Sequence, residues 1–251
     1  MRPTSSQFRD HFSPAARDYA RYRPGYPDAL FSWIASEAPS RAVAWDAATG
    51  TGQAALGLAA HFDRVVATDA SEAQLASAQR HARVYYVRAK SEACAIASSV
   101  AGAVCVAQAL HWFDMPSFFA ECARVAMPGA IVAVWTYGTL EIGPDIDGAL
   151  TRFYEDVVGP YWPPERRIVE REYADIELPF AQVATPSFAM VRAMTLDDLA
   201  GYIGTWSATL RYRKATGTDP VPAFIASIAG AWGTGARETR WPIGVRAGRV
   251  A

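Results

Sequence analysis

The residues best suited to chemistry lie in one short loop and in an acid that follows it. The segment WDAATGTGQ (45–53) combines Asp46 with small residues and two glycines, Gly50 and Gly52. Small residues let a ligand approach the backbone closely, and a helix that starts here offers free N–H groups to a carboxylate or a phosphate. Asp69 stands twenty-three residues after Asp46, where an acid in a doubly wound sheet bonds ribose hydroxyls. The spacing predicts a site for a nucleoside-containing cofactor.

Two classes of enzyme share this pattern. Residues 50–55 satisfy GxGxxA, which is typical of NAD(P)-dependent oxidoreductases, and Tyr86 and Lys90 have the spacing of a YxxxK catalytic pair. We interpret that pair as a chance match, because four residues along a strand separate two side chains widely. An acid beside a pyrophosphate repels it, whereas the methionine ammonium of S-adenosylmethionine needs an anionic partner. Asp46 therefore favours S-adenosylmethionine, although Asp46 and Asp69 are also suited to simple capping of a turn or helix.

Three further side chains are candidates for the reaction itself. His111, in the segment QALHWF (108–113), is suited to act as a base or a hydrogen-bond donor, or equally to pack and shape the loop. Trp112 and Tyr137 fall at the carboxyl ends of predicted strands, where open α/β sheets bind ligands. Their rings are suited to hold an apolar substrate, to shield a sulfonium by a cation–π contact, or to fill the core.

Three arginines in an aromatic, proline-rich segment raise the question of an acidic substrate. Arg166, Arg167 and Arg171 each carry a guanidinium that clamps a carboxylate well. Solvated surface arginines are the favoured interpretation. A carboxylate acceptor is already ionised and needs no general base, so an acid methylated on oxygen is the leading hypothesis for the substrate.

Alternating apolar runs and helical stretches must position these residues. Predicted strands are 41–46, 64–69, 83–89, 102–108 and 130–135, with 182–188 and 240–248 as candidates, and predicted helices are 28–37, 52–62, one from Ser71, one capped by Asp114 through Val125, 195–210 and 220–232. Ser71 with Gln74 three residues on fits a capping box. Strands that are apolar on both faces and alternate with helices indicate a parallel sheet covered on both sides.

The chain divides into three stretches of one domain. Residues 1–40 are an expected N-terminal helical cap, 41–136 a cofactor-binding core, and 137–251 the remaining strands with cap insertions that form the substrate side. The predicted fold is α/β, a Rossmann-like doubly wound, seven-stranded and mostly parallel sheet with helical caps.

Composition excludes several functions. Twenty-four basic and twenty-five acidic side chains give a net charge of −1, which argues against a nucleic-acid partner. Three cysteines without CxxC spacing and four scattered histidines predict no disulfide framework and no metal site. The start of the sequence has no apolar run, and no stretch is long enough to span a bilayer, so a soluble cytoplasmic protein without a membrane partner is expected.

Several segments together resemble class I S-adenosylmethionine-dependent methyltransferases of the type 11 group. They are DAATGTGQ (46–53), ATDAS (67–71), SEA (91–93), VAQALHWFD (106–114) and MPGAIVAVW (127–135). The segments 11–27 and 205–222 are similar to the small-molecule methyltransferases that include trans-aconitate and cantharidin methyltransferases. The resemblance implies S-adenosylmethionine as cofactor and a small-molecule substrate.

The resemblance also implies roles for individual residues. Residues at the methionine end of the cofactor would be Asp46, Thr49, Gly50, Gly52 and Gln108, and Ala48 and Gln53 would also belong to the cofactor site. The ribose and adenine would meet Asp69, Ala70, Ser91 and Glu92, and Tyr19 and Arg23 would fold over the cofactor. Two departures stand out. The family has glycine where Ala48 stands, which would cost about 1 kcal/mol if that position needs a positive φ. The family's acid near the start of the fourth strand is replaced by Gly102 and Ala103.

We therefore predict a methyltransferase acting on a small molecule. An NAD(P)-dependent oxidoreductase and a non-catalytic S-adenosylmethionine-binding protein remain as alternatives. Neither the methyl acceptor nor the oligomeric state follows from the sequence.

Overall fold

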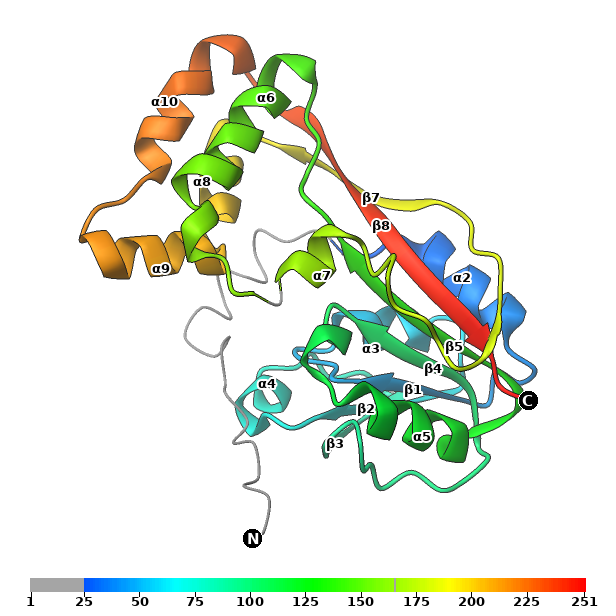
Figure 1. The fold of residues 1–251 in the computed structure, drawn as a ribbon. Helices are drawn as coiled ribbons and strands as arrows, with labels where there is room; N and C mark the ends of the chain where they lie inside the picture. The colour runs from blue at the N-terminus through cyan, green and yellow to red at the C-terminus, as the bar shows by residue number, and fades with distance from the viewer. Residues whose placement is uncertain (1–24, 165) are drawn as a thin grey trace, which may run out of the picture.

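Five parallel strands form the centre of the protein in the order β3-β2-β1-β4-β5 (Figure 1). The computed structural model of the protein describes residues 25–164 and 166–251. The parallel strands are β1 (Val43–Ala47), β2 (Arg64–Asp69), β3 (Val84–Arg88), β4 (Ala101–Ala107) and β5 (Ala126–Tyr137). All five predicted strands form, and β2 has the predicted bounds. Because the chain runs outward in opposite directions from β1 and β4, the carboxyl ends of these two strands are where ligands bind in such sheets.

Three later strands extend the sheet in the antiparallel sense. The long strand β8 (Arg237–Arg249) pairs with β5, and its other edge pairs with β7 (Phe188–Met194) at one end and with β6 (Ala181–Gln182) at the other. The predicted mixed, mostly parallel α/β fold is confirmed. The sheet has eight strands in place of the expected seven, because two short strands share one edge of β8.

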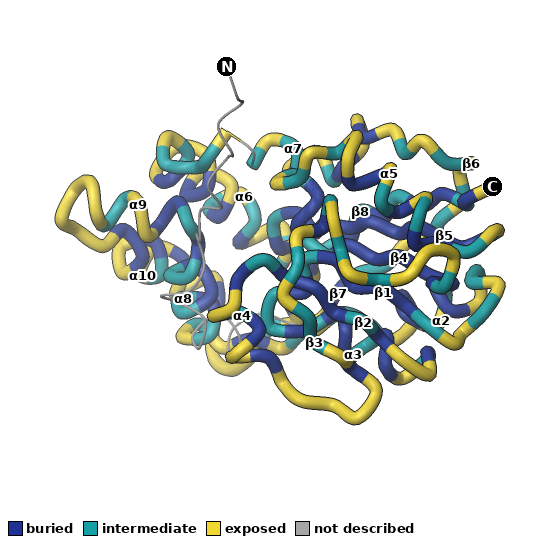
Figure 2. The backbone as a smooth tube through the Cα atoms, turned by 90° about the horizontal axis from the view of Figure 1, so that it is seen from below, coloured by how far each residue is buried: buried dark blue, intermediate teal, exposed yellow. Residues whose placement is uncertain are grey.

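Helices cover both faces of the parallel part. Side chains alternate along β1, so Ala44 packs on the face that carries α2 (Asp28–Glu37) and α3 (Gln53–Ala59), whereas Trp45 packs on the face of α5 (Met115–Val125). Figure 2 shows β1, β4 and β5 as buried strands. Burial on two faces explains why these strands are apolar without alternation.

Most helices of the second half of the chain gather beyond the carboxyl end of β5 and form a cap (Figure 1). The cap consists of α6 (Pro144–Arg152), a π-helical turn (Phe153–Val157), a 3-10 turn (Gly159–Tyr161), α8 (Leu196–Gly204), α9 (Ser207–Thr216) and α10 (Val221–Trp232). The short helix α7 (Arg166–Glu170) lies between the cap and the sheet.

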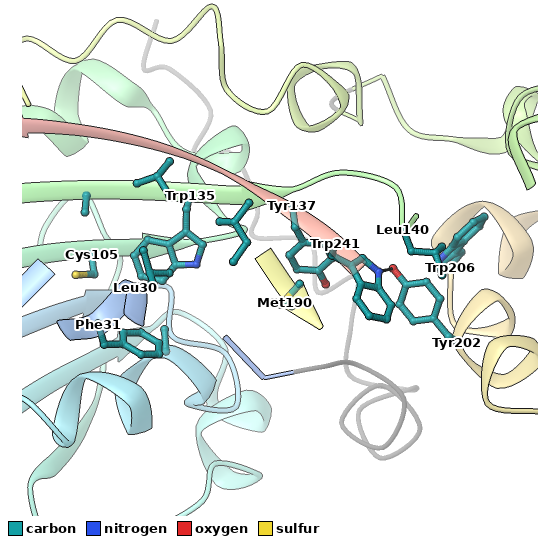
Figure 3. Packing of buried hydrophobic residues seen from close by; sticks show 14 of the residues in the cluster. Leu30, Phe31, Cys105, Trp135, Tyr137, Leu140, Met190, Tyr202, Trp206 and Trp241 are labelled. Atoms are coloured by element: carbon teal, nitrogen blue, oxygen red, sulfur yellow. Dashed lines mark hydrogen bonds between the residues drawn. The ribbon is translucent and has the colours of Figure 1, made fainter. Parts of the chain in front are cut away.

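A row of aromatic side chains connects the cap to the sheet. Figure 3 shows Trp135 and Tyr137 of β5 followed by Trp241 of β8, then Tyr202 and Trp206 of the cap. The Trp241 indole donates a hydrogen bond to the Tyr202 hydroxyl at 2.9 Å. Core and cap thus bury one continuous hydrophobic cluster.

The second half of the chain departs from two predictions. Residues 182–188 do not form one strand, because β6 ends at Gln182 and β7 begins at Phe188. Pro186 lies in the gap and has no N–H to give to a ladder. The predicted helix 195–210 is two helices, since the Thr205 hydroxyl bonds the Tyr202 carbonyl and the next residue is extended.

Details of two helix starts can also be compared with the predictions. The Ser71 hydroxyl accepts from the backbone N–H of Gln74 and caps α4 (Glu72–Ala76), which is one half of the predicted capping box, while the Ser71 N–H donates to the Asp69 carboxylate. Asp114 stands at the N-cap of α5, but its carboxylate accepts from the Ser117 hydroxyl and not from a backbone N–H. Of the helices described, none has the length and apolar character needed to cross a membrane.

Candidate functional site

The predicted cofactor loop lies at the carboxyl ends of β1 and β4. Gly50 and Gly52 adopt φ values of +57° and +89°, which glycine reaches without steric cost. Gly52 is the N-cap of α3, and a Cβ added there would collide with the Tyr86 hydroxyl. The loop therefore keeps a bare backbone at the switch point of the sheet.

Asp46 is fully buried beneath this loop on the α3 face of β1. Its Oδ2 accepts from the Thr49 hydroxyl at 2.5 Å, whereas Oδ1 has no hydrogen-bond partner among the described residues. Burial raises the pKa of this carboxyl to about 7. The hydrogen bond from Thr49 lowers the pKa, and the negative charge of Asp69 raises it further. A buried acceptor without a donor is costly, so Oδ1 is a place where a cation would be stabilised.

Asp69 ties the loop to the end of β2. Its Oδ2 accepts from the Gly50 N–H and its Oδ1 from the Ser71 N–H, both at 2.8 Å. The bond to Ser71 is the capping role considered above, and the bond to Gly50 positions the glycine loop. Because a carboxylate accepts about four hydrogen bonds, the same group retains capacity for ribose hydroxyls.

Two non-glycine residues at this edge have left-handed backbone conformations. Ala48 has φ +54° and Gln108 has φ +56°, at the ends of the neighbouring strands β1 and β4. The family's glycine position therefore does need a positive φ, and alanine adopts it here at a cost of about 1–2 kcal/mol. The Gln108 side chain is fixed, because its amide donates to the Tyr137 carbonyl and accepts from the Thr136 hydroxyl. Strained backbone of this kind clusters at ligand sites.

Packing explains why Gly102 stands near the start of β4, where the family has an acid. A Cβ at Gly102 would collide with the backbone carbonyl oxygen of Ser40. No side chain, acidic or otherwise, fits at this position of β4.

His111 stands in the 3-10 turn Leu110–Trp112 that follows β4. Its Nδ1 is hydrogen bonded to the Tyr173 hydroxyl at 2.9 Å, and its Nε2 has no hydrogen bond to a described residue. Burial, assisted by the positive charge of Arg166, lowers the pKa of His111 to about 4. The imidazole is therefore neutral at pH 7, and the Trp112 ring lies beside it with centroids 4.8 Å apart.

The other predicted site residues occupy varied environments. Tyr137 is only 5% exposed and packs in the core cluster, 6.5 Å from the Tyr26 ring, whereas Trp112 is 40% exposed. Ser91 is buried, and the Glu92 carboxylate accepts from the backbone N–H of Asp114 at 3.3 Å. Half-buried positions are held by Gln53 and Ala70. Tyr19 and Arg23 lie outside the described residues.

Two residues of this region were not expected from the sequence. Tyr86 covers Gly52 and donates its hydroxyl to the Gln79 carbonyl, while Lys90 lies beyond the end of β3, so the two form no catalytic pair. The register Asp46–Ala67–Tyr86 across three strands explains this placement. Tyr173, buried after α7, reaches His111 from an irregular segment that has no sequence signal.

A groove of about 940 Å³ runs between α5 and residues 167–180. Its lining includes Met115, Phe119, Arg167, Arg171 and Tyr173, and none of the predicted cofactor residues. Its lining residue Tyr173 also contacts His111, so the groove adjoins the turn after β4 without including the glycine loop.

Fold and edge together define a nucleoside-binding α/β enzyme, and comparison with known proteins specifies the class. Residues 45–134 match the methyltransferase-domain family model. A Dictyostelium discoideum protein described as a methyltransferase is 30% identical over 236 residues, which cover 92% of this chain and 90% of the relative. A solved structure from Anaeromyxobacter dehalogenans, described as a type II methyltransferase, has 42% identity and a TM-score of 0.87 over 90% of this chain and 97% of that one. The chain belongs to the class I S-adenosylmethionine-dependent methyltransferases.

This membership settles the choice between cofactors. The oxidoreductase alternative is wrong, and S-adenosylmethionine is the cofactor. The residues of this site fit S-adenosylmethionine. Asp46 Oδ1, which has no partner among the described residues, can accept from the ammonium of the cofactor, and the absence of a side chain at Gly50 lets the cofactor approach the loop backbone closely. The narrower likeness to trans-aconitate and cantharidin methyltransferases stays a prediction.

Proposed function

We propose that the protein transfers a methyl group from S-adenosylmethionine to a carboxylate oxygen of a small acidic molecule. The observation that carries this proposal is the environment of His111, the imidazole at the carboxyl end of β4. Its pKa of about 4 makes it a weak base. An amine, a phenol or a carbon acid needs a base to take its proton, whereas a carboxylate is already ionised at neutral pH.

The chain's own residues bind, orient and exclude water. With S-adenosylmethionine bound, Asp46 would hold the methionine ammonium, Asp69 would take the ribose hydroxyls, and Gln108 would lie beside the methionine moiety. The bound cofactor would supply an electrophilic methyl group, which an oxygen lone pair of the acceptor can take because the departing sulfur keeps the electrons of the broken carbon–sulfur bond. No proton changes place. His111, whose Nε2 has no hydrogen bond to a described residue, would orient the acceptor by a hydrogen bond, and the neighbouring Trp112 ring would shield the site of methyl transfer.

A thermal-shift panel followed by a methyl-acceptor screen tests the proposal. S-adenosylhomocysteine at a hundred times its Kd should stabilise the protein by about 2.7 kcal/mol, which raises the Tm by roughly 5–10 °C. NAD and NADP should give no shift. Labelled methyl groups should then pass to carboxylic acids, giving base-labile esters. Transfer only to amines or phenols would contradict the carboxylate acceptor, and binding without transfer to any class would favour a non-catalytic S-adenosylmethionine-binding protein.

A further inference from the structure

Three arginines follow one another on or just after α7, and they have different environments. Arg167 and Arg171 are exposed and line the groove beside α5, and Arg171 also pairs with Asp175 at 2.7 Å. One hundred degrees of helix rotation separate Arg166 from Arg167. The Arg166 side chain is only 20% exposed and packs against aromatic rings of the preceding cap segment.

One hydrogen bond from Nε and contacts with two aromatic rings hold the Arg166 guanidinium in place. Its Nε–H donates to the Tyr154 hydroxyl at 2.7 Å, and that hydroxyl donates to the Glu170 carboxylate at 2.5 Å. The guanidinium carbon lies 4.7 Å from the centre of the Trp162 ring and 5.6 Å from that of Tyr154. Stacking on aromatic faces and a single tethered nitrogen fix the orientation of the planar group.

The two terminal nitrogens of Arg166 have no acceptor within residues 25–164 and 166–251. Neither Nη1 nor Nη2 of Arg166 makes a hydrogen bond to a described residue, and the Glu170 carboxylate lies 4.0 Å from Nε. Beside the guanidinium, the buried Nε1–H of Trp162 also has no partner in the described part of the chain. A preoriented fork of unpaired N–H donors matches the geometry of a carboxylate.

Arg166 also lies within electrostatic reach of the reaction centre. Its positive charge contributes to the lowered pKa of His111, so the two groups share one electrostatic environment. The hydrogen bond from Tyr173 to His111 further ties the turn after β4 to the segment that follows α7. Residues 166–173 thus carry both the Arg166 guanidinium and, at Tyr173, a direct contact to the loop that holds His111.

We propose that Arg166, seated between Tyr154 and Trp162, is the residue that recognises a carboxylate group of the substrate. This inference rests on the proposed function, since it names the feature of the acceptor that the site selects. The ligand class is a small carboxylic acid, and its neutral amide lacks the second oxygen acceptor and the charge that the fork needs.

Binding to matched acids and amides tests the assignment. Benzoate, succinate and citrate, with benzamide and succinamide as neutral counterparts, are titrated calorimetrically into the protein with and without S-adenosylhomocysteine. At least one acid should bind the parent protein, and no amide should bind. Arg166→Gln should weaken acid binding at least tenfold, and Arg166→Lys should recover only part of it because it lacks the fork. Both variants should keep the parent Kd for S-adenosylhomocysteine.

Arg167→Gln is the matched control, because it removes the same charge from the neighbouring, exposed position. It should bind acids like the parent protein. Acid binding that survives in Arg166→Gln, equal loss in Arg167→Gln, or no acid binding by a protein that binds S-adenosylhomocysteine would overturn the assignment. Failure to bind S-adenosylhomocysteine would instead contradict the proposed function. If Arg166→Gln does not fold, the Arg166→Lys comparison decides.

Discussion

The cofactor edge and the cap position their side chains by different means. At the edge, backbone groups do most of the positioning, as when Asp69 accepts from the amides of Gly50 and Ser71. In the cap, aromatic rings do so. The centre of the Trp206 ring lies 5.5–6.3 Å from the centres of four other rings, those of Phe153, Tyr154, Trp162 and Tyr202. Backbone geometry is set locally by turns, whereas ring packing joins segments that are distant in sequence. Changes at the edge should thus alter cofactor affinity, and changes in the cap should alter stability.

The largest expected effect is in the cap. Trp206 is 4% exposed, so Trp206→Ala should leave a cavity and lower the free energy of unfolding by about 3–5 kcal/mol. Calorimetry at a temperature where the variant is folded should give an unchanged Kd for S-adenosylhomocysteine. Leu210→Ala, at an exposed position of the next helix, should cost under about 1 kcal/mol. A large loss of cofactor affinity in Trp206→Ala would contradict the assignment of cofactor binding to the edge and of stability to the cap.

The converse experiment is at the edge. Asp69→Ala should weaken binding of S-adenosylhomocysteine about a hundredfold or more, because two charged hydrogen bonds are worth about 3 kcal/mol together. Isothermal titration calorimetry measures this directly. Asp63→Ala, an exposed acid before the same strand, should leave the Kd unchanged. An unaltered Kd in Asp69→Ala would remove the ribose assignment.

Asp46 should link stability to pH with a predictable sign. Its pKa is raised from 3.8 to about 7 by burial, so its contribution to stability is complete below pH 3.8 and is lost as the pH rises through 7. The neutral variant Asp46→Asn should therefore exceed the parent in stability at pH 8 by about 1–3 kcal/mol, and lose that advantage by pH 4. Thermal unfolding of the ligand-free proteins across this range measures the difference.

The same variant should bind the cofactor less well, because it cannot pair with the ammonium. Parent affinity for S-adenosylhomocysteine should rise as the pH passes from 6 to 8, and the affinity of Asp46→Asn should not. Parallel pH profiles would refute the ammonium assignment.

His111→Ala should separate turnover from cofactor binding. We expect a decrease in kcat of about tenfold, equivalent to about 1.4 kcal/mol, because an orienting hydrogen bond is lost. The Kd for S-adenosylhomocysteine should stay within twofold. Full activity with an identified acceptor would reduce His111 to a packing residue of its loop.

The smallest effect concerns the strained turn. Ala48 has φ +54°, so Ala48→Gly should relieve strain and stabilise the protein by about 0.5–1 kcal/mol after the added flexibility of the unfolded chain is counted. Ala73→Gly, in the right-handed turn of α4, should destabilise it by a similar amount. Equal signs for the two variants would contradict the strain at Ala48.

The edge is predictable from sequence because its signals are local. An apolar run that ends in an acid gives both β1 with Asp46 and β2 with Asp69, and parallel register then brings the two acids to one edge. Tyr86 is not predictable in this way, since its contact with Gly52 depends on register across two strand pairs.

The environments of the cap residues are not predictable from sequence, because they depend on contacts and side-chain bonds that no local sequence pattern reveals. Arg166 and Arg167 are adjacent in sequence and alike in chemistry, and only the rings of Tyr154 and Trp162 distinguish them. The break at Thr205 likewise depends on a side chain bonding a helix carbonyl, which helical periodicity does not reveal.

The position of β8 has a consequence for how the protein is made. Residues 237–249 are synthesised after β5 and β7, yet they pair with both. During translation at roughly 5–20 residues per second, the edge of β5 therefore waits on the order of ten seconds for its partner. Because β5 is buried over most of its length in the finished protein, this nascent edge is apolar and open to pairing with other chains. The unfinished chain thus carries an open, apolar strand edge that the finished protein covers with its last strand.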